Sequence, residues 1–484
     1  MKRIIFLFLF ISSFIYIYAE TDLNVEISSF IGISLSNSSY LYNENEAFFK
    51  ANTKLSEDIN FFGSFGINYT PYPLSETSSK DMLENSSYLY PLTIYLDEAY
   101  VSANNFVFDG LDFVVGKQRI SWGKADKVNP TDVLNPQDLS KITDLGRKIP
   151  LFAFNFTYYF PFLNDYGVQF VWEPYQGQSI LPVRFIEEKL TSRIKEKISE
   201  SVTSVDIDEN WTGEVKYPEF NLTNSTLAGK IFGKVFGFDF SINVARRQND
   251  IPYISEIYLE NSNAINFPSM SETNVTVLSK SYKMAYHKET EIGFDLEKDW
   301  GIFVNRCELA IFIPDEVKTT TYTTVKTPIP FPPTTIVTNI TNEEVILKEP
   351  YVKWIIGLDK NFDGGWYINF QIAHGLFMER GYKEEKLQDY FTFNIEKGFF
   401  DDKLKFKLFG IANTDNFIDK FKDNDIIKSF IDNSAIMGNF EIVYSPIMGL
   451  DFKAGICGID GKGKATLTSY KEYDMFYLEV SSSF

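Results

Sequence analysis

Residues 352–373 read VKWIIGLDKNFDGGWYINFQIA and contain the clearest hairpin pattern in the chain. On both sides of the Asp363-Gly364-Gly365 turn, apolar residues recur at every second position: Val352, Trp354, Ile356 and Leu358, then Trp366, Ile368, Phe370 and Ile372. The opposite face of the second segment carries Tyr367, Asn369 and Gln371. A period of two with one apolar face is typical of β-strands, so this stretch predicts two antiparallel strands.

The same pattern continues along the chain. After the hairpin, Phe391, Phe393 and Ile395 alternate with polar residues, and beyond Asp401-Asp402 the residues Leu404, Phe406 and Leu408 alternate with lysines. Further candidate strands start near residues 23, 46, 58, 91, 105, 151, 165, 228, 237, 275, 289, 301, 436, 449 and 473. These make about 16–19 segments, and the even strand number of bacterial barrels selects 16 or 18.

Composition narrows the classes of protein that the chain can be. It has 484 residues, a net charge of −19, 17% aromatic and 23% charged residues, two histidines and two cysteines. The negative charge argues against a nucleic-acid binder, and the few His and Cys residues argue against a His-rich metal site, a disulfide framework or a zinc ribbon. No cofactor and no metal site are expected. Beyond the first 20 residues no apolar run is long enough for a membrane-spanning helix, which leaves a closed β-barrel as the way to cross a bilayer.

The first 19 residues are expected to be a signal peptide. Lys2 and Arg3 precede the apolar segment Ile4–Tyr18, and Ala19 stands at a suitable cleavage point. An uncleaved anchor helix is the alternative, although this apolar segment is short for a bilayer. Residues 20–484 are then expected to form an all-β fold, a single large antiparallel transmembrane β-barrel in the bacterial outer membrane.

The connections between the strands are expected to be unequal. Tight turns such as Asp109-Gly110 should face the periplasm and long loops should face the exterior. The predicted long loops are 70–90, 176–226, 249–273, 314–350 and 414–434. Within the second of these, apolar residues at helical spacing predict a short helix near 185–205, and the Thr/Pro run from Thr319 to Thr338 predicts a solvated loop.

The last residues of the chain carry a separate signal. They read YDMFYLEVSSSF, and Phe476, Leu478, Val480 and Phe484 share one parity. An alternating strand that ends on an aromatic residue resembles the terminal strand recognised by the outer-membrane barrel assembly machinery. Phe484 is therefore the predicted assembly signal, and this machinery is a predicted partner.

Residues 116–150, GKQRISWGKADKVNPTDVLNPQDLSKITDLGRKIP, differ from the strands around them. The pattern N-P-x-D occurs twice, as Asn129-Pro130-Thr131-Asp132 and as Asn135-Pro136-Gln137-Asp138. Asn before Pro is disfavoured in a helix and Asp can hold a local turn, so an ordered loop is expected. Two placements remain open: a loop folded into the lumen that narrows it, or a brace that shapes the barrel wall.

These residues resemble a motif set of porin-like outer-membrane barrels of Gram-negative bacteria. The matching parts are Gly116-Lys117-Gln118 with Trp122-Gly123, the first N-P-x-D, and Arg147-Lys148-Ile149-Pro150. The chain also looks similar to the wider group that contains alginate-export-type channels. The resemblance covers a small part of the chain and implies a channel without naming its solute.

The candidates for pore-lining or constriction residues are Lys117, Arg119, Ser121, Lys124, Asp126, Asp132, Asp138 and Arg147. Lys117, Arg119 and Ser121 share a parity and are expected to face water. Because charges are screened over about 8 Å at physiological salt, basic residues at a constriction should outweigh acidic residues on distant loops. This predicts a preference for small anionic solutes.

No enzymatic activity is expected. His287 and His374 have no nucleophile signature beside them. Cys307 and Cys457 are expected to fill apolar surroundings as free thiols, and a disulfide bond between them is the alternative.

The sequence thus predicts a porin-like channel for passive diffusion of small solutes. The alternatives are a surface barrel that acts as an adhesin or ligand-binding receptor without transport, and a soluble periplasmic β-protein. Outer-membrane lipid and small solutes are the predicted partners, and homo-oligomerisation is left open.

Overall fold

The computed structural model describes residues 20–70, 92–140, 146–163, 165–181, 191, 204–206, 211–265, 273–329, 334–376, 379–381, 386–415, 433–463 and 465–484. The predicted signal peptide lies outside these residues. In the part of the chain that is described, no helix is long and apolar enough to span a membrane.

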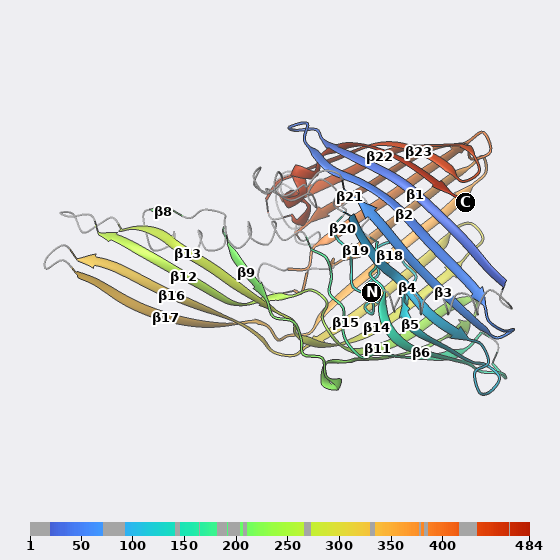
Figure 1. Ribbon diagram of the computed structural model, residues 1–484, viewed down its shortest axis with the longest axis horizontal. Helices are drawn as coiled ribbons and strands as arrows, with labels where there is room; N and C mark the ends of the chain where they lie inside the picture. The colour runs from blue at the N-terminus through green and yellow to red at the C-terminus, as the bar shows by residue number, and fades with distance from the viewer. Residues whose placement is uncertain are drawn as a thin grey trace, which may run out of the picture.

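Eighteen strands form one sheet (Figure 1). They are β1 (Glu20–Ser34), β2 (Tyr40–Lys54), β3 (Ile59–Tyr69), β4 (Leu92–Ala103), β5 (Leu111–Gln118), β6 (Leu151–Tyr159), β7 (Gly167–Glu173), β10 (Thr226–Val235), β11 (Phe238–Gln248), β14 (Lys288–Asp299), β15 (Val304–Pro314), β18 (Tyr351–Phe362), β19 (Trp366–His374), β20 (Asp389–Phe399), β21 (Leu404–Thr414), β22 (Ser434–Ile447), β23 (Leu450–Gly461) and β24 (Met475–Ser483). Because β1 pairs antiparallel with both β2 and β24, the sheet closes on itself. The predicted all-β barrel is confirmed, with the larger of the two predicted strand numbers.

The hairpin at residues 352–373 shows why the barrel suits a membrane. Gly364 and Gly365 turn the chain at φ 82° and 81°, a conformation that costs glycine little. Ile356 on the outer face is 48% exposed, whereas Gln371 on the inner face is 6% exposed. The outer face of this hairpin is therefore apolar, and each of the eighteen barrel strands pairs with a neighbour at both edges, as a sheet in lipid requires.

The two rims of the barrel differ in the length of their connections. Short turns at 55–58, 236–237, 363–365, 400–403 and 448–449 join strands at one rim. The other rim carries the longer connections, including 119–150 between β5 and β6. At the rim of the short turns, Phe484 exchanges backbone hydrogen bonds with Val25 of β1 at 2.8 and 3.0 Å, so the end of the chain seals the barrel.

A second sheet extends from the rim of the long connections (Figure 1). It consists of β8 (Ser204–Asp206), β9 (Thr212–Val215), β12 (Tyr253–Ile265), β13 (Thr273–Ala285), β16 (Val317–Ile329) and β17 (Thr334–Leu347). The β12–β13 and β16–β17 hairpins join through parallel pairing of β12 with β16. The predicted loops 249–273 and 314–350 do fall between consecutive barrel strands, but their described residues form strands at 253–265, 317–329 and 334–347. The expectation of irregular structure is wrong there, and so is the solvated loop for the described residues of Thr319–Thr338. Thr, Val and Ile favour extended backbone even where apolar alternation is absent.

Other predicted connections are described only in part. Loops 70–90 and 414–434 lie almost wholly outside the described residues. So does the predicted helix at 185–205, of which only Thr191, Ser204 and Val205 are described. Ser204 and Val205 belong to β8 and not to a helix, which corrects the end of that prediction. Two short 3-10 helices are η2 (Leu222–Asn224) and η3 (Thr466–Tyr473).

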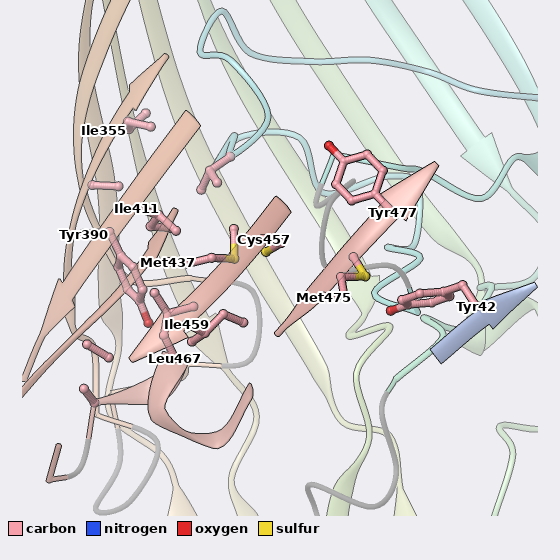
Figure 2. Packing of buried hydrophobic residues seen from close by; sticks show 14 of the residues in the cluster. Tyr42, Ile355, Tyr390, Ile411, Met437, Cys457, Ile459, Leu467, Met475 and Tyr477 are labelled. Atoms are coloured by element: carbon pink, nitrogen blue, oxygen red, sulfur yellow. The ribbon is translucent and has the colours of Figure 1, made fainter. Parts of the chain in front are cut away.

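Apolar side chains fill part of the barrel near η3. Leu467 of η3 belongs to one buried cluster with Tyr390, Ile411 and Ile459 (Figure 2). Cys457 also belongs to this cluster, and both Cys457 and Cys307 are free thiols. This packing holds η3 against β21, β22 and β23.

Candidate pore and its lumenal loop

The described residues of the connection 119–150, which are 119–140 and 146–150, form a loop inside the barrel. Trp122, Thr131 and Leu134 are almost completely buried. The backbone of this loop is hydrogen-bonded to inward-facing side chains of β15 and β19, on the opposite wall. Of the two placements that the sequence left open, the structure therefore shows the lumenal one.

Glu308 of β15 anchors the loop by its carboxylate. Oε1 accepts hydrogen bonds from the backbone amides of Lys124 at 2.5 Å and Ala125 at 2.6 Å. Oε2 accepts from the Thr131 hydroxyl at 2.9 Å and from the Thr131 amide at 3.3 Å. Gly123, at φ 85°, lets the backbone approach so closely, because a Cβ there would lie 2.6 Å from Oε1 of Glu308.

Two further strands hold the same segment. Gln371 of β19 donates from Nε2 to the carbonyl of Asp126 at 3.1 Å and accepts from the Asp126 amide at 3.2 Å. The Lys127 ammonium lies 5.0 Å from the centre of the Phe409 ring on β21. The loop therefore crosses the lumen from β5 to β15, β19 and β21.

The two N-P-x-D motifs fold the loop upon itself. Asp132 lies 3.5 Å from the Lys148 ammonium, which also donates to the Asp132 carbonyl at 2.8 Å. Asp138 accepts a hydrogen bond from the Ser140 hydroxyl at 2.6 Å and lies 3.4 Å from Nε of Arg147. Both aspartates are buried. These two carboxylates are thus used within the loop, and they are not open to a passing solute.

Arg119 follows β5 directly and faces acidic side chains of β4. Its guanidinium bonds both oxygens of Asp97, at 2.6 and 2.8 Å, and Glu98 at 3.1 Å. Nε donates to the Lys148 carbonyl at 2.8 Å. Two carboxylates against one guanidinium leave this spot without excess positive charge.

Lys117 lies on the outer face of β5, contrary to the expectation that it faces water in the lumen. It pairs with Phe152 of β6, and Phe154, two residues further along the same face, stacks on Trp172. Its ammonium donates to the Leu96 carbonyl at 2.5 Å, beside a bulge in the β3–β4 pairing. The expectation assumed that alternation runs on to Ser121, but β5 ends at Gln118.

An opening of about 450 Å³ remains between the loop and the wall formed by β1, β2, β4, β23 and β24. Its charged lining residues are Glu26, Glu46, Asp97, Arg119, Arg147, Asp451, Lys453 and Glu479. Ser28 and Ser481 also line it. Water and small polar solutes suit such a lining.

Acidic groups dominate this opening. The basic residues are paired: Arg119 with Asp97 at 2.6 Å, Arg147 with Asp138 at 3.4 Å, and Lys453 with Glu479 at 2.8 Å. Glu46 accepts a hydrogen bond from the Tyr95 hydroxyl, and Asp451 accepts one from the Ser445 hydroxyl at 2.5 Å. Neither Glu46 nor Asp451 has a basic partner within 4.0 Å among the described residues, so the opening carries uncompensated negative charge.

A buried ionic cluster lies where the barrel meets the second sheet. The Arg247 guanidinium bonds Asp250 and Glu289, each at 2.8 Å, and His287 lies 3.4 Å from Glu289. Burial lowers the pKa of His287. Burial alone would raise the pKa of Asp250, but the Arg247 guanidinium outweighs it and holds that pKa below its usual range. The cluster therefore combines a neutral imidazole with an ionised carboxylate.

Both histidines lie beside carboxylates. His287 contacts Glu289, and Nδ1 of His374 lies 2.6 Å from Asp389. In the described parts of the chain, no serine, threonine or cysteine is hydrogen-bonded to either imidazole.

Comparisons with known proteins identify no family. No family model and no curated protein matches the chain. Similar solved structures include OccK1 (OpdK) of Pseudomonas aeruginosa, at 7% identity, a TM-score of 0.49 and coverage of 96% of this chain and 98% of that chain. OccAB3 of Acinetobacter baumannii has 9% identity, a TM-score of 0.46 and coverage of 96% and 99%. OmpF of Salmonella typhi has 8% identity, a TM-score of 0.38 and coverage of 96% and 97%. The expected similarity to alginate-export-type channels finds no support in these comparisons.

Proposed function

We propose that the protein is a channel of the bacterial outer membrane through which small polar solutes diffuse passively. The observation that carries this proposal is the charged opening left between the lumenal loop and the wall of a closed, externally apolar barrel. Solutes would be selected by the width of the opening and by its lining charge. Outer-membrane lipid, the barrel assembly machinery that reads Phe484, and the solutes themselves are its partners.

The same opening supports a preference for cations. Lys117 lies outside, Arg119 is neutralised by Asp97 and Glu98, and Glu46 and Asp451 remain without basic partners. Negative charge on the lining raises the local concentration of cations. This proposal reverses the anionic preference that the basic residues of the loop predicted from sequence.

Reversal potentials in planar bilayers test this selectivity. Under a potassium chloride gradient the wild-type channel should favour K⁺, and Glu46→Gln with Asp451→Asn should move the reversal potential towards zero at a similar conductance. Screening over about 8 Å confines the effect to charges at the opening, so Glu57→Gln, in the turn 55–58, should change nothing. An unchanged reversal potential in the double variant would exclude Glu46 and Asp451 as selectivity determinants.

One observation favours a second role beside transport. The six-stranded sheet projects from the rim, contributes nothing to the opening, and presents a large surface outside the barrel (Figure 1). A sheet in this position is suited to contact with another surface.

A further inference from the structure

The outer edge of the projecting sheet is formed by β17 (Figure 1). Among the described strands, β17 pairs only with β16. On the far side of the sheet, β13 is covered by β8 and β9. One edge of this sheet is thus partly covered by short strands, and at the other edge no described strand pairs with the outer side of residues 334–342.

Over residues 334–342, no charge and no proline prevents another strand from pairing with β17. Thr334–Leu347 contains no proline, lysine or arginine, and its pairing with β16 is regular from Lys318 to Ile329. Ile336, Val337 and Ile340 are 50%, 54% and 51% exposed. Proteins usually block a long edge strand with charges, prolines or bulges, so an unblocked edge of this length indicates a surface that receives a strand.

The sequence of β17 indicates which strand. Residues 334–342 read TTIVTNITN, are uncharged, and are nearly symmetric about Thr338: Ile336 and Ile340 flank it at two residues, and Thr335 and Thr341 flank it at three. When an edge strand meets an identical edge across a two-fold axis, the strands run antiparallel and residues equidistant from the axis face each other.

We propose that two copies of this chain pair edge to edge through residues 334–342, antiparallel about Thr338. Ile336 then faces Ile340 of the partner subunit, and Thr335 faces Thr341 of the partner subunit. Such β-branched and hydroxyl pairs stabilise neighbouring strands. The acidic residues Glu343 and Glu344 follow the paired segment, so no like charges meet within it. The ladder between β16 and β17 continues across the axis into one sheet.

This pairing determines how the two barrels are arranged. β17 runs from the tip of the projecting sheet towards β18 in the barrel (Figure 1). Antiparallel pairing of the tips therefore places the barrels at opposite ends, in two membranes that face each other. Nine residues at about 3.4 Å each give an overlap of only about 31 Å. One pair is consequently weak, and many pairs between two surfaces would act together.

Tethering of vesicles tests this pairing, which rests on the barrel spanning a membrane and not on transport. The full chain is reconstituted into two vesicle populations with donor and acceptor lipid dyes, and wild-type vesicles should tether and transfer energy. Ile336→Lys with Ile340→Lys should abolish tethering, as should Ile336→Glu with Ile340→Glu, because like charges then face each other twice. Vesicles with the Lys variant mixed with vesicles with the Glu variant should tether again.

The controls separate this proposal from channel activity and from misfolding. Val345→Lys lies on β17 but outside the paired segment, so it should tether as the wild type does. Every variant should conduct like the wild type, which shows that its barrel has folded. Three results would each overturn the proposal: no tethering by wild-type vesicles, tethering unaffected by the Lys pair, or no recovery when the Lys and Glu vesicles are mixed.

Discussion

At the scale of single residues, the path through the barrel depends on a few polar anchors that the sequence did not single out. The N-P-x-D motifs predicted an ordered loop, because Asn-Pro and Asp act locally on the backbone. Glu308 could not be predicted in the same way, since it lies 177 residues beyond Thr131 in the chain. Alternation identifies an inward-facing glutamate, but it does not say which loop that glutamate will meet.

Removal of the Glu308 anchor should loosen the loop. Glu308→Ala leaves the amides of Lys124, Ala125 and Thr131 without their acceptor, and each buried amide left unpaired costs about 1–3 kcal/mol. We expect larger or rapidly fluctuating single-channel conductance, recorded in planar bilayers. Thr131→Val, which removes only the hydroxyl bond, should give a much smaller change.

The conductance trace of Glu308→Ala decides whether the anchor matters. If both variants conduct as steadily as the wild type while heat-modifiable migration shows folded barrels, Glu308 does not hold the loop in the lumen. The packing of Trp122 and Leu134 would then suffice to keep the loop in place.

At the scale of elements, strands with clear alternation were predictable and strands without it were not. The hairpin at 352–373 matches β18 and β19, because one face meets lipid and the other faces the lumen. In the projecting sheet, the candidate strand near residue 275 matches β13, whereas β12, β16 and β17 were predicted as loops. β17 is exposed on both faces over most of its length and therefore has no apolar face to alternate. Without one buried face, a strand has no reason to alternate apolar and polar residues, so the sequence shows no strand pattern at β17.

The joint between the barrel and the projecting sheet should weaken in acid. His287, buried beside Arg247 and Arg380, has a pKa below the value of about 6.5 in the unfolded chain, so the unfolded chain takes up the proton first. Stability is then lost as the pH falls below about 6.5, and the lowered pKa of Asp250 adds a loss below about pH 4. Each unit by which the pKa of His287 is lowered corresponds to about 1.4 kcal/mol.

Hydrogen exchange can locate this effect. On going from pH 7 to pH 5, amides of β12 and β13 should lose protection relative to amides of β18 and β19, after correction for intrinsic rates. In His287→Gln, which cannot be protonated, the difference should largely disappear. Equal loss of protection in the variant and the wild type would assign the pH dependence to other groups.

At the scale of the whole molecule, the chain combines a closed barrel, a loop that crosses its lumen, and a sheet that projects beyond its rim. The barrel followed from the sequence, because lipid outside and water inside impose alternation on every strand. The position of the opening did not, since it depends on contacts between segments far apart in the chain. The account's central claim is that solutes pass between the lumenal loop and the wall of β1, β2, β4, β23 and β24.

Modification of introduced cysteines tests this claim most directly. Ser28 lines the opening, whereas Ala310 is buried on β15 in the same cluster as Trp122 of the loop. A bulky charged thiol reagent, added during bilayer recording, should reduce the current of Ser28→Cys in steps and leave Ala310→Cys unchanged. The wild type serves as the control for reaction of the reagent with the native thiols Cys307 and Cys457, of which Cys457 is buried. A block of Ala310→Cys without a block of Ser28→Cys, or no current through any of these channels, would contradict the account.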